Sequence, residues 1–316
     1  MEQNEIIRLF SVEFRKMLSE SGIDFEKLQE IRLRVNQPAI LIYDNEEIYI
    51  NKNGICKDIT RAYCVNQKEL RETMEYIANF SLYAFEEEIR QGFITVCGGH
   101  RIGICGKVFM EGKSIRSIKY ISYINVRVSH EIIGCSNKLI KYITNKGQFL
   151  HTLVISPPGC GKTTLLRDLI RNLSNGFEDV SGQSIGVIDE RSELAGSYLG
   201  VPGNDLGIRS DILDCCPKDK GIEILIRSMA PKIIAIDELG GEADCRALEN
   251  SLFCGCKLLA TIHGSSIEEI RAKPQIKRII SQNIFERYIV LEYGSRPGKI
   301  KGIYNEQFQR MEGEYA

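Results

Sequence analysis

The sequence has no excess of charge of either sign and no long apolar run. Its 41 Lys and Arg residues balance 42 Asp and Glu residues, for a formal net charge of −1. Such a chain has no general attraction to nucleic acid or anionic membranes, although local basic patches can exist. No segment approaches the roughly 18 apolar residues of a membrane-spanning helix, and the polar start Met-Glu-Gln-Asn-Glu is unlike a signal peptide. We expect a cytoplasmic protein with no nucleic-acid partner and no membrane insertion.

Histidine is scarce, with 4 in 316 residues, and the 11 cysteines show no metal-binding spacing. Cys215-Cys216 and Cys254-x-Cys256 are too closely spaced for paired C-x-x-C zinc sites. The cysteine number is odd, and several cysteines lie within apolar segments, as reduced cysteines do. We therefore expect neither structural zinc nor a disulfide framework.

The sequence does contain a phosphate-binding segment at residues 153–164, Leu-Val-Ile-Ser-Pro-Pro-Gly-Cys-Gly-Lys-Thr-Thr. An apolar strand, a glycine-containing turn and an amphipathic helix follow one another, so backbone N–H groups and the helix N-terminus can face a phosphate. Lys162 is expected to reach the β- and γ-phosphates of ATP, and Thr163 to ligate Mg²⁺. Ser156 replaces the first glycine of G-x-x-x-x-G-K-[ST], but Pro157-Pro158 still favours a turn. The predicted nucleotide-binding residues are Pro158, Gly159, Cys160, Gly161, Lys162, Thr163 and Thr164.

Two domains are expected, with a short linker near residues 129–135. Residues 1–130 are predicted to form a smaller α+β domain with an antiparallel sheet, and residues 131–316 an α/β domain with a parallel-rich sheet. In the first domain, periodicity predicts helices over 4–20 and 67–84, a hairpin turn at Asp44-Asn45, and strands over 30–35, 39–43, 47–50, 93–97, 101–108 and 118–128. In the second it predicts a helix over 136–146 and strands over 153–155, 184–188, 233–236, 258–262 and 288–291.

An apolar strand over 233–236 ends in two carboxylates, Asp237 and Glu238. At the carboxyl end of a parallel strand beside the phosphate loop, Asp237 is expected to hold Mg²⁺. Glu238, one residue further on, is expected to orient and deprotonate an attacking water. An exposed acidic strand end is the alternative interpretation, and the phosphate loop upstream favours the functional one.

Two other strands end in polar residues. Asp189, Glu190 and Glu193 follow the strand over 184–188, where a site near the γ-phosphate and a solvated acidic loop are equally good interpretations. His263 follows the strand over 258–262 in Thr261-Ile-His-Gly. It either senses the phosphate state, contacts a neighbouring subunit, or simply packs and caps.

The order of these segments resembles a known family. The Walker A segment at 156–164, the acidic box at 189–193, Asp237-Glu238 and the Thr-x-His box at 261–263 occur in this order in the secretion ATPases, the hexameric motors of type II and type IV secretion and of pilus systems. Three further segments are similar to the stage III sporulation protein AA family of endospore-forming bacteria, and that resemblance covers nearly the whole chain. They are Glu30-Ile-Arg-Leu-Arg-Val, Gly98–Gly106 and Asn204–Lys218.

This resemblance implies a RecA-like P-loop ATPase in the mother-cell cytoplasm, peripheral to a membrane complex. It implies a homo-oligomer, in the family a hexameric ring, that hydrolyses ATP with Mg²⁺ for membrane-embedded channel proteins between mother cell and forespore. It also implies roles for single residues: Glu238 as catalytic base, Asp189 or Glu190 in the acidic box, His263 in the histidine box, and Arg101 and Arg127 of the first domain as γ-phosphate contacts.

Two other functions remain open at this point. One is a nucleic-acid-stimulated motor, which the near-zero net charge weakens. The other is a small-molecule phosphotransferase, which needs an acceptor pocket and usually a mobile basic lid. The segment 209–220 is the stretch that can be argued as such a lid.

Overall fold

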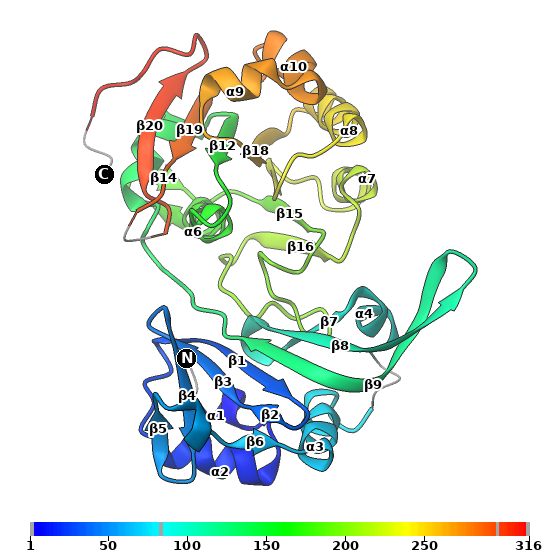
Figure 1. The fold of residues 1–316 in the computed structure, drawn as a ribbon. Coiled ribbons are helices and arrows are strands. Elements are labelled where there is room, and N and C mark those ends of the chain that lie inside the picture. The colour runs from blue at the N-terminus through cyan, green and yellow to red at the C-terminus, as the bar shows by residue number, and fades with distance from the viewer. Residues whose placement is uncertain (1–2, 82–84, 295–296, 314–316) are drawn as a thin grey trace. The chain divides into compact units, whose positions relative to one another are not determined.

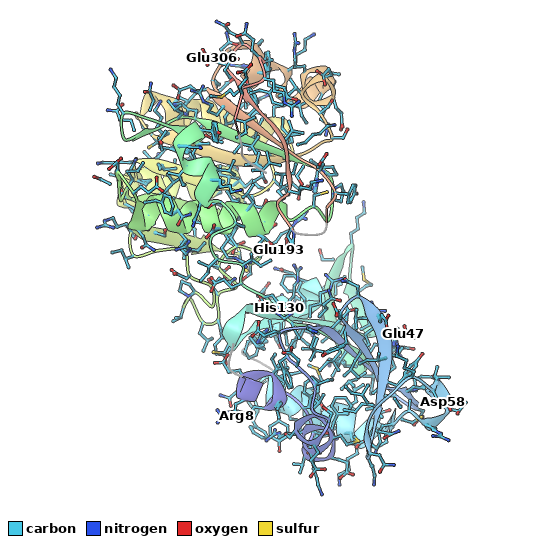
Figure 2. All side chains as sticks on the ribbon, turned by 90° about the vertical axis from the view of Figure 1, so that its left-hand side faces the viewer. Arg8, Glu47, Asp58, His130, Glu193 and Glu306 are labelled. Atoms are coloured by element: carbon cyan, nitrogen blue, oxygen red, sulfur yellow. The ribbon has the colours of Figure 1, made fainter. Side chains whose placement is uncertain are left out.

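The chain folds into two compact units (Figure 1). The structure, a computed structural model, describes residues 3–81, 85–294 and 297–313. The first unit comprises Met1–His130 together with Gly196–Gly203, and the second comprises Glu131–Ala195 and Asn204–Ala316. The main segment of the first unit ends at His130 (Figure 2), whose Nε2 lies 2.7 Å from the carbonyl oxygen of Leu28.

The first unit is built on an antiparallel seven-stranded sheet in the order β5-β4-β3-β1-β9-β8-β7. Its strands are β1 (Leu28–Arg34), β3 (Ile40–Tyr43), β4 (Glu46–Asn51), β5 (Gly54–Cys56), β7 (Phe93–Val96), β8 (His100–Glu111) and β9 (Ser114–Arg127). Its helices are α1 (Gln3–Ile7), α2 (Val12–Glu20), α3 (Gln67–Ile77) and α4 (Glu86–Gln91), and β2 (Gln37–Pro38) pairs with β6 (Cys64–Val65). The predicted α+β class with an antiparallel sheet is confirmed.

In the first unit one predicted turn is confirmed and two predicted helices differ from the structure. The hairpin turn at Asp44-Asn45 is confirmed, with φ values of 52° and 64°, the pair of left-handed residues that a type I′ turn requires. The helix predicted over 4–20 is instead two helices. Ser11 between them is extended, and its buried N–H donates to Thr73 Oγ1 at 3.0 Å. The helix predicted over 67–84 ends at Ile77, and residues 82–84 lie outside the described part of the chain.

The second unit is built on a seven-stranded sheet in the order β16-β15-β17-β18-β12-β19-β20. All neighbours are parallel except β19 and β20. The strands are β12 (Thr152–Ser156), β15 (Ile185–Asp189), β16 (Ser210–Asp214), β17 (Ile233–Ile236), β18 (Lys257–His263), β19 (Arg287–Leu291) and β20 (Ile300–Asn305). The helices are α5 (Ile140–Ile143), α6 (Lys162–Asn175), α7 (Lys218–Ser228), α8 (Glu242–Phe253), α9 (Ile267–Ala272) and α10 (Pro274–Ser281). Two short ribbons pair β10 (Thr144–Asn145) with β11 (Gln148–Phe149) and β13 (Gly176–Phe177) with β14 (Val180–Ser181).

Both faces of this sheet are buried, because successive side chains of its apolar strands point to opposite faces. Val154 of β12 joins a core with Leu165 and Leu169 of α6, whereas Leu153 and Ile155 join a second core. That second core includes apolar side chains of the helices α7 to α10. The predicted parallel-rich α/β class is thus confirmed.

The second unit differs from the sequence-based expectations in three respects. The helix predicted over 136–146 is a 3₁₀ turn, Asn137–Leu139, followed by the single turn α5 and by β10. The sequence did not predict β16 or the antiparallel edge strand β20. Residues 209–220, considered as a lid, contribute β16 to the sheet edge and begin α7. None of the helices described is both long and apolar enough to span a bilayer.

Candidate active site

The site lies where parallel strands end side by side. Registers place Ser156 at the end of β12 opposite His263 of β18, and Ile188 of β15 opposite Ile236 of β17. The loops that leave these strand ends therefore meet at one edge of the sheet, as is general for ligand sites in open parallel sheets. This brings the phosphate loop together with Asp237-Glu238, the acidic box and the Thr-x-His box.

The phosphate loop has the backbone conformation that its glycines allow. Gly159 and Gly161 are left-handed, with φ of 76° and 84°, and α6 begins directly after Gly161. A Cβ at Gly161 would lie 2.5 Å from both Gly298 N and Pro297 Cβ, while the Gly298 N–H donates to the Cys160 carbonyl at 2.7 Å. The segment at 297–298 thus supports the loop from behind, a contact that the sequence did not reveal.

Ser156 replaces the usual first glycine without apparent cost to this loop. Ser156 is fully buried. Its hydroxyl donates to the Pro157 carbonyl at 2.8 Å, and its own carbonyl accepts the Gly264 N–H at 3.1 Å. Ser156 is not among the non-glycine residues with positive φ in the described chain. A glycine is therefore not needed there for backbone reasons.

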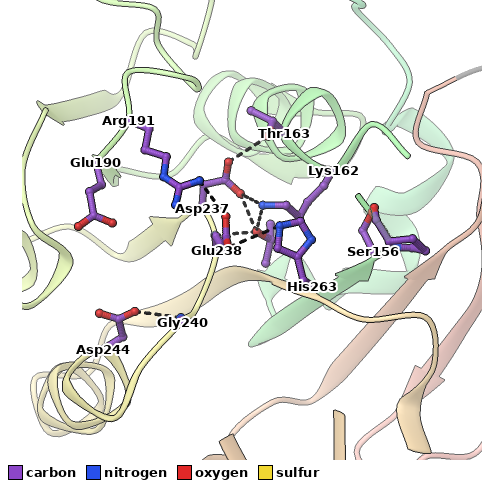
Figure 3. Close-up of polar contacts among 12 residues, drawn as sticks. Ser156, Lys162, Thr163, Glu190, Arg191, Asp237, Glu238, Gly240, Asp244 and His263 are labelled. Carbon is purple, nitrogen blue, oxygen red and sulfur yellow. Dashed lines mark hydrogen bonds and ion pairs between the residues drawn. The ribbon is translucent and has the colours of Figure 1, made fainter. Parts of the chain in front are cut away.

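Lys162, Thr163 and Asp237 form a connected polar cluster (Figure 3). The Lys162 ammonium contacts an Asp237 carboxylate oxygen, and Thr163 Oγ1 donates to the other, Oδ2, at 3.0 Å. Burial raises the pKa of Asp237, but Lys162 and the hydroxyls of Thr261 and Thr163 outweigh burial and hold that pKa below its usual value. Asp237 is therefore an anion beside a hydroxyl oxygen, the donor set that Mg²⁺ prefers.

Thr261 connects this cluster to Glu238. Its Oγ1 accepts hydrogen bonds from Lys162 Nζ at 3.0 Å and from the Glu238 N–H at 2.8 Å, and it donates to Asp237 Oδ1 at 2.7 Å. A hydroxyl has one proton and two lone pairs, so this group is saturated. Sequence reasoning included Thr261 in the Thr-x-His box but gave it no role. Its position beside the strand end was the signal that could have suggested one.

Glu238 extends from a strained backbone between two positively charged or protonatable groups. Its φ of 59° is left-handed, which is uncommon for a residue with a Cβ. Its Oε1 lies 3.5 Å from His263 Nε2, and its Oε2 lies 3.4 Å from Arg191 Nη1. The structure thus brings His263 and Glu238 together and adds Arg191, which the sequence did not single out.

A cavity of about 430 Å³ opens over this cluster. Such a volume is within the range of small-molecule sites. Cys160 is not among its lining residues, since its side chain is buried with the core beneath α6. The lining residues are Pro157, Pro158, Gly159, Gly161, Lys162, Thr163, Thr164, Arg191, Glu193, Glu238, His263 and Pro297.

The acidic box is organised around Asp189, which is only 1% exposed. Its carboxylate accepts the backbone N–H groups of Glu193 at 2.8 Å, Leu194 at 3.0 Å and Ala195 at 2.8 Å. Burial raises the pKa of Asp189 to about 6, although these N–H groups oppose the rise. This carboxylate therefore fastens the loop that follows β15.

The remaining predicted residues occupy different surroundings. Glu190 contacts Lys218 at the start of α7. Arg101 and Arg127 belong to the first unit, where they are cross-strand neighbours in β8 and β9. The Arg101 guanidinium lies 3.7 Å from the centre of the Phe93 ring, and Arg127 Nε lies 3.4 Å from Glu30 Oε1. Their contact with a γ-phosphate stays a prediction.

Comparison with known proteins adds the family. The sequence model described as Sporulation stage III, protein AA matches residues 1–311. The chain belongs to the stage III sporulation protein AA family. Within the family, Stage III sporulation protein AA of Bacillus subtilis (strain 168) is 34% identical over 304 residues, which cover 96% of this chain and 95% of the relative. The predicted resemblance to this family is confirmed.

More distant relatives share part of the chain or only the fold. The uncharacterized protein ycf45 of Porphyra purpurea is 27% identical over 157 residues, 49% of this chain and 26% of that protein. The pilus retraction motor PilT, solved with bound ADP, aligns with a TM-score of 0.56 and 13% identity over 95% of this chain and 81% of that one. The ATPase DotB of Legionella pneumophila aligns with a TM-score of 0.53 and 14% identity over 88% and 75%. At this identity the likeness concerns the fold alone, and the predicted RecA-like fold is confirmed.

Proposed function

We propose that this chain is an ATPase that hydrolyses ATP in the presence of Mg²⁺. The observation that carries the proposal is the cluster of Lys162, Thr163, Asp237 and Glu238 beside a cavity of about 430 Å³ at the end of a parallel sheet. A phosphate loop, a carboxylate suited to a metal and a second carboxylate on the cavity wall are the parts that ATP hydrolysis needs.

Each part has a defined task in this proposal. The Lys162 ammonium leaves Asp237 and binds the β- and γ-phosphates, which carry more negative charge than one carboxylate. Thr163 and Asp237 would hold Mg²⁺, which neutralises charge on the phosphates when bound. The Glu238 carboxylate accepts a proton from the attacking water as the bond between the β,γ-bridging oxygen and the γ-phosphorus breaks.

The biological setting follows from the family and the fold. Membership of the stage III sporulation protein AA family supports a role in sporulation, and the fold of DotB and PilT supports an ATPase that does mechanical work. We propose a homo-oligomeric, hexameric ring in the mother-cell cytoplasm. It would energise membrane-embedded channel proteins of the sporulation apparatus, with Arg101 and Arg127 completing the nucleotide site.

The two alternatives receive less support. A phosphotransferase is disfavoured because residues 210–214 form β16 and residues 218–220 begin α7, so the segment 209–220 is not a separate lid. A nucleic-acid motor gains no support from a net charge of −1. Single-stranded DNA and candidate acceptors are nevertheless included in the assay below, because strong stimulation by DNA, or ADP formed only with an acceptor, would replace this proposal.

The decisive test compares Glu238→Gln with Lys162→Ala. We expect Glu238→Gln to bind ATP normally and to lose turnover by about 10²- to 10⁴-fold, the usual contribution of a general base. Lys162→Ala should lose both binding and turnover. Nucleotide binding by fluorescence and phosphate release measure the two properties. Glu223→Gln, on the exposed side of α7, is the matched control. Wild-type turnover in Glu238→Gln would mean that another group is the base.

A further inference from the structure

We propose that Arg191 is a catalytic residue that binds the γ-phosphate of ATP and leaves Glu238 when it does so. The inference rests on the proposed ATPase function and assigns a cation of the same chain to the phosphate that is cleaved. It differs from the expected arginines of the first unit, Arg101 and Arg127, because Arg191 lies in the acidic-box loop of the second unit.

The first observation is the position of the Arg191 side chain. It lines the same cavity as Lys162, Thr163 and Glu238. Its Nη1 lies 3.4 Å from Glu238 Oε2, and Figure 3 shows the guanidinium directed toward that carboxylate. Lys162 and Arg191 are the two Lys or Arg side chains in the lining of this cavity, as far as the chain is described. A triphosphate that enters therefore meets both.

The second observation is that the backbone near Arg191 is fixed while its side chain is not. Asp189 accepts the N–H groups of residues 193–195, and the buried Arg167 of α6 donates to the carbonyls of Leu194 at 2.8 Å and Glu193 at 2.9 Å. The loop is thus held from both sides. The Arg191 side chain, 64% exposed, can move its guanidinium without moving the loop.

The third argument is the relative strength of two ion pairs. An ion pair as accessible to solvent as Arg191–Glu238 is weak, so breaking it costs little free energy. A guanidinium on a phosphate makes charge-assisted and often bidentate hydrogen bonds, which are stronger. ATP therefore draws Arg191 away from Glu238, whereas ADP, which has no γ-phosphate, does not. The released Glu238 carboxylate can then accept the proton of the attacking water, and Arg191 neutralises charge on the transferred phosphoryl group.

Arg191→Ala tests this inference through nucleotide selectivity. We expect its affinity for a slowly hydrolysed ATP analogue to fall by about 10- to 100-fold, as the loss of a charge-assisted pair implies, with ADP affinity within about twofold of wild type. Turnover should fall by at least about 10²-fold, since arginines on a transferred phosphoryl group contribute about 10³ to 10⁵. Arg191→Lys, which keeps the charge and loses the planar fork, should be intermediate. Fluorescence titrations with both nucleotides and phosphate release supply the measurements.

The control is Arg227→Ala, an exposed arginine of α7 outside the cavity lining, which should leave both affinities and turnover unchanged. Thermal unfolding of each variant checks that the fold is intact. Equal loss of ATP-analogue and ADP affinity in Arg191→Ala, or wild-type selectivity and turnover, overturns the role of Arg191 and leaves the ATPase proposal standing if the wild type hydrolyses ATP. A wild-type protein that neither binds nor hydrolyses ATP overturns both.

Discussion

Thr261 shows how much of the site depends on one neutral hydroxyl. Its oxygen holds Lys162, Asp237 and the backbone of Glu238 in one network within a buried environment. Thr261→Val has nearly the same shape but removes the hydroxyl. Since the Glu238 N–H then has no acceptor there, we expect a loss of about 1 to 3 kcal/mol in the free energy of unfolding. We also expect lower kcat because Glu238 loses its anchor.

Chemical denaturation and steady-state kinetics measure the two effects, and Thr261→Ser, which keeps the hydroxyl, is the control. Unchanged stability and kcat in Thr261→Val would show that the hydrogen bonds of Thr261 contribute to neither property.

At the residue scale the sequence supplied part of the site. Lys162 and Thr163 were predictable because the phosphate loop is a local motif, and Asp237 because an apolar strand ends there. The contact between Lys162 and Asp237 confirms only their proximity, and their roles stay predictions. Arg191 could not be singled out, because an arginine in an acidic loop carries no motif. Its place in the cavity depends on Asp189 and Arg167, which bind the backbone of the loop that carries Arg191 and belong to no phosphate-binding motif.

At the scale of elements, the loop after β15 is the part whose interpretation the structure sharpens most. The sequence left two interpretations open for Asp189, a site near the γ-phosphate and a solvated acidic loop. In the structure its carboxylate oxygens accept three backbone N–H groups. Asp189→Asn replaces one acceptor oxygen by an NH₂ group that opposes these donors. We expect a loss of about 1 to 3 kcal/mol in unfolding free energy and weaker ATP-over-ADP selectivity, because Arg191 is no longer held in place.

Thermal or chemical unfolding and paired nucleotide titrations measure this prediction. Glu190→Gln, at the neighbouring exposed carboxylate, is the control and should leave stability nearly unchanged. Loss of turnover in Asp189→Asn with full stability would instead indicate a direct catalytic role for Asp189.

Elements with strong apolar runs were predictable, and those defined by distant contacts were not. The runs at β12, β15, β17, β18 and β19 fill a sheet buried on both faces, so their composition alone indicates strands. β16 reads Ser-Asp-Ile-Leu-Asp, a polar edge strand with no clear pattern. The break between α1 and α2 depends on Ser11 meeting Thr73, a contact that periodicity cannot reveal.

For the whole molecule, pH provides a test of how the first unit is held together. His100 is fully buried, its Nδ1 accepts the Ser129 N–H at 3.1 Å, and burial, with a smaller effect of His130, lowers its pKa to about 4. In the unfolded chain its pKa returns to about 6.5, so between these values the unfolded state binds more protons. The contribution of neutral His100 to the free energy of unfolding is fully present above about pH 6.5. It is lost as pH falls toward 4, by up to about 3 kcal/mol.

His100→Asn, which keeps a hydrogen-bond acceptor, should flatten this dependence. Unfolding free energies measured from pH 7 to pH 4.5 give the slope for variant and wild type. His151 of the second unit also has a pKa lowered to about 4, mainly by burial, so a residual slope is expected. An identical slope in both proteins would show that folding does not lower the pKa of His100.

The division of the molecule itself was not fully predictable. A change of pattern near residues 129–135 suggested two consecutive domains, and the first unit's main segment does end at His130. The return of Gly196–Gly203 to the first unit has no signal in composition. It rests on the Tyr198 ring, stacked on Phe85 at 6.2 Å, and on Gly203, where a Cβ would lie 2.6 Å from Gly99 N.

This return has a consequence for biosynthesis. A ribosome finishes the first 130 residues before it makes the eight-residue segment that completes their unit, and between the two it makes the phosphate loop, α6 and β15. Until Tyr198 emerges, the nascent first unit lacks the ring that covers Phe85. The two units therefore cannot complete their folding one after the other in the order of synthesis. Part of the second unit must be made before the first unit is complete.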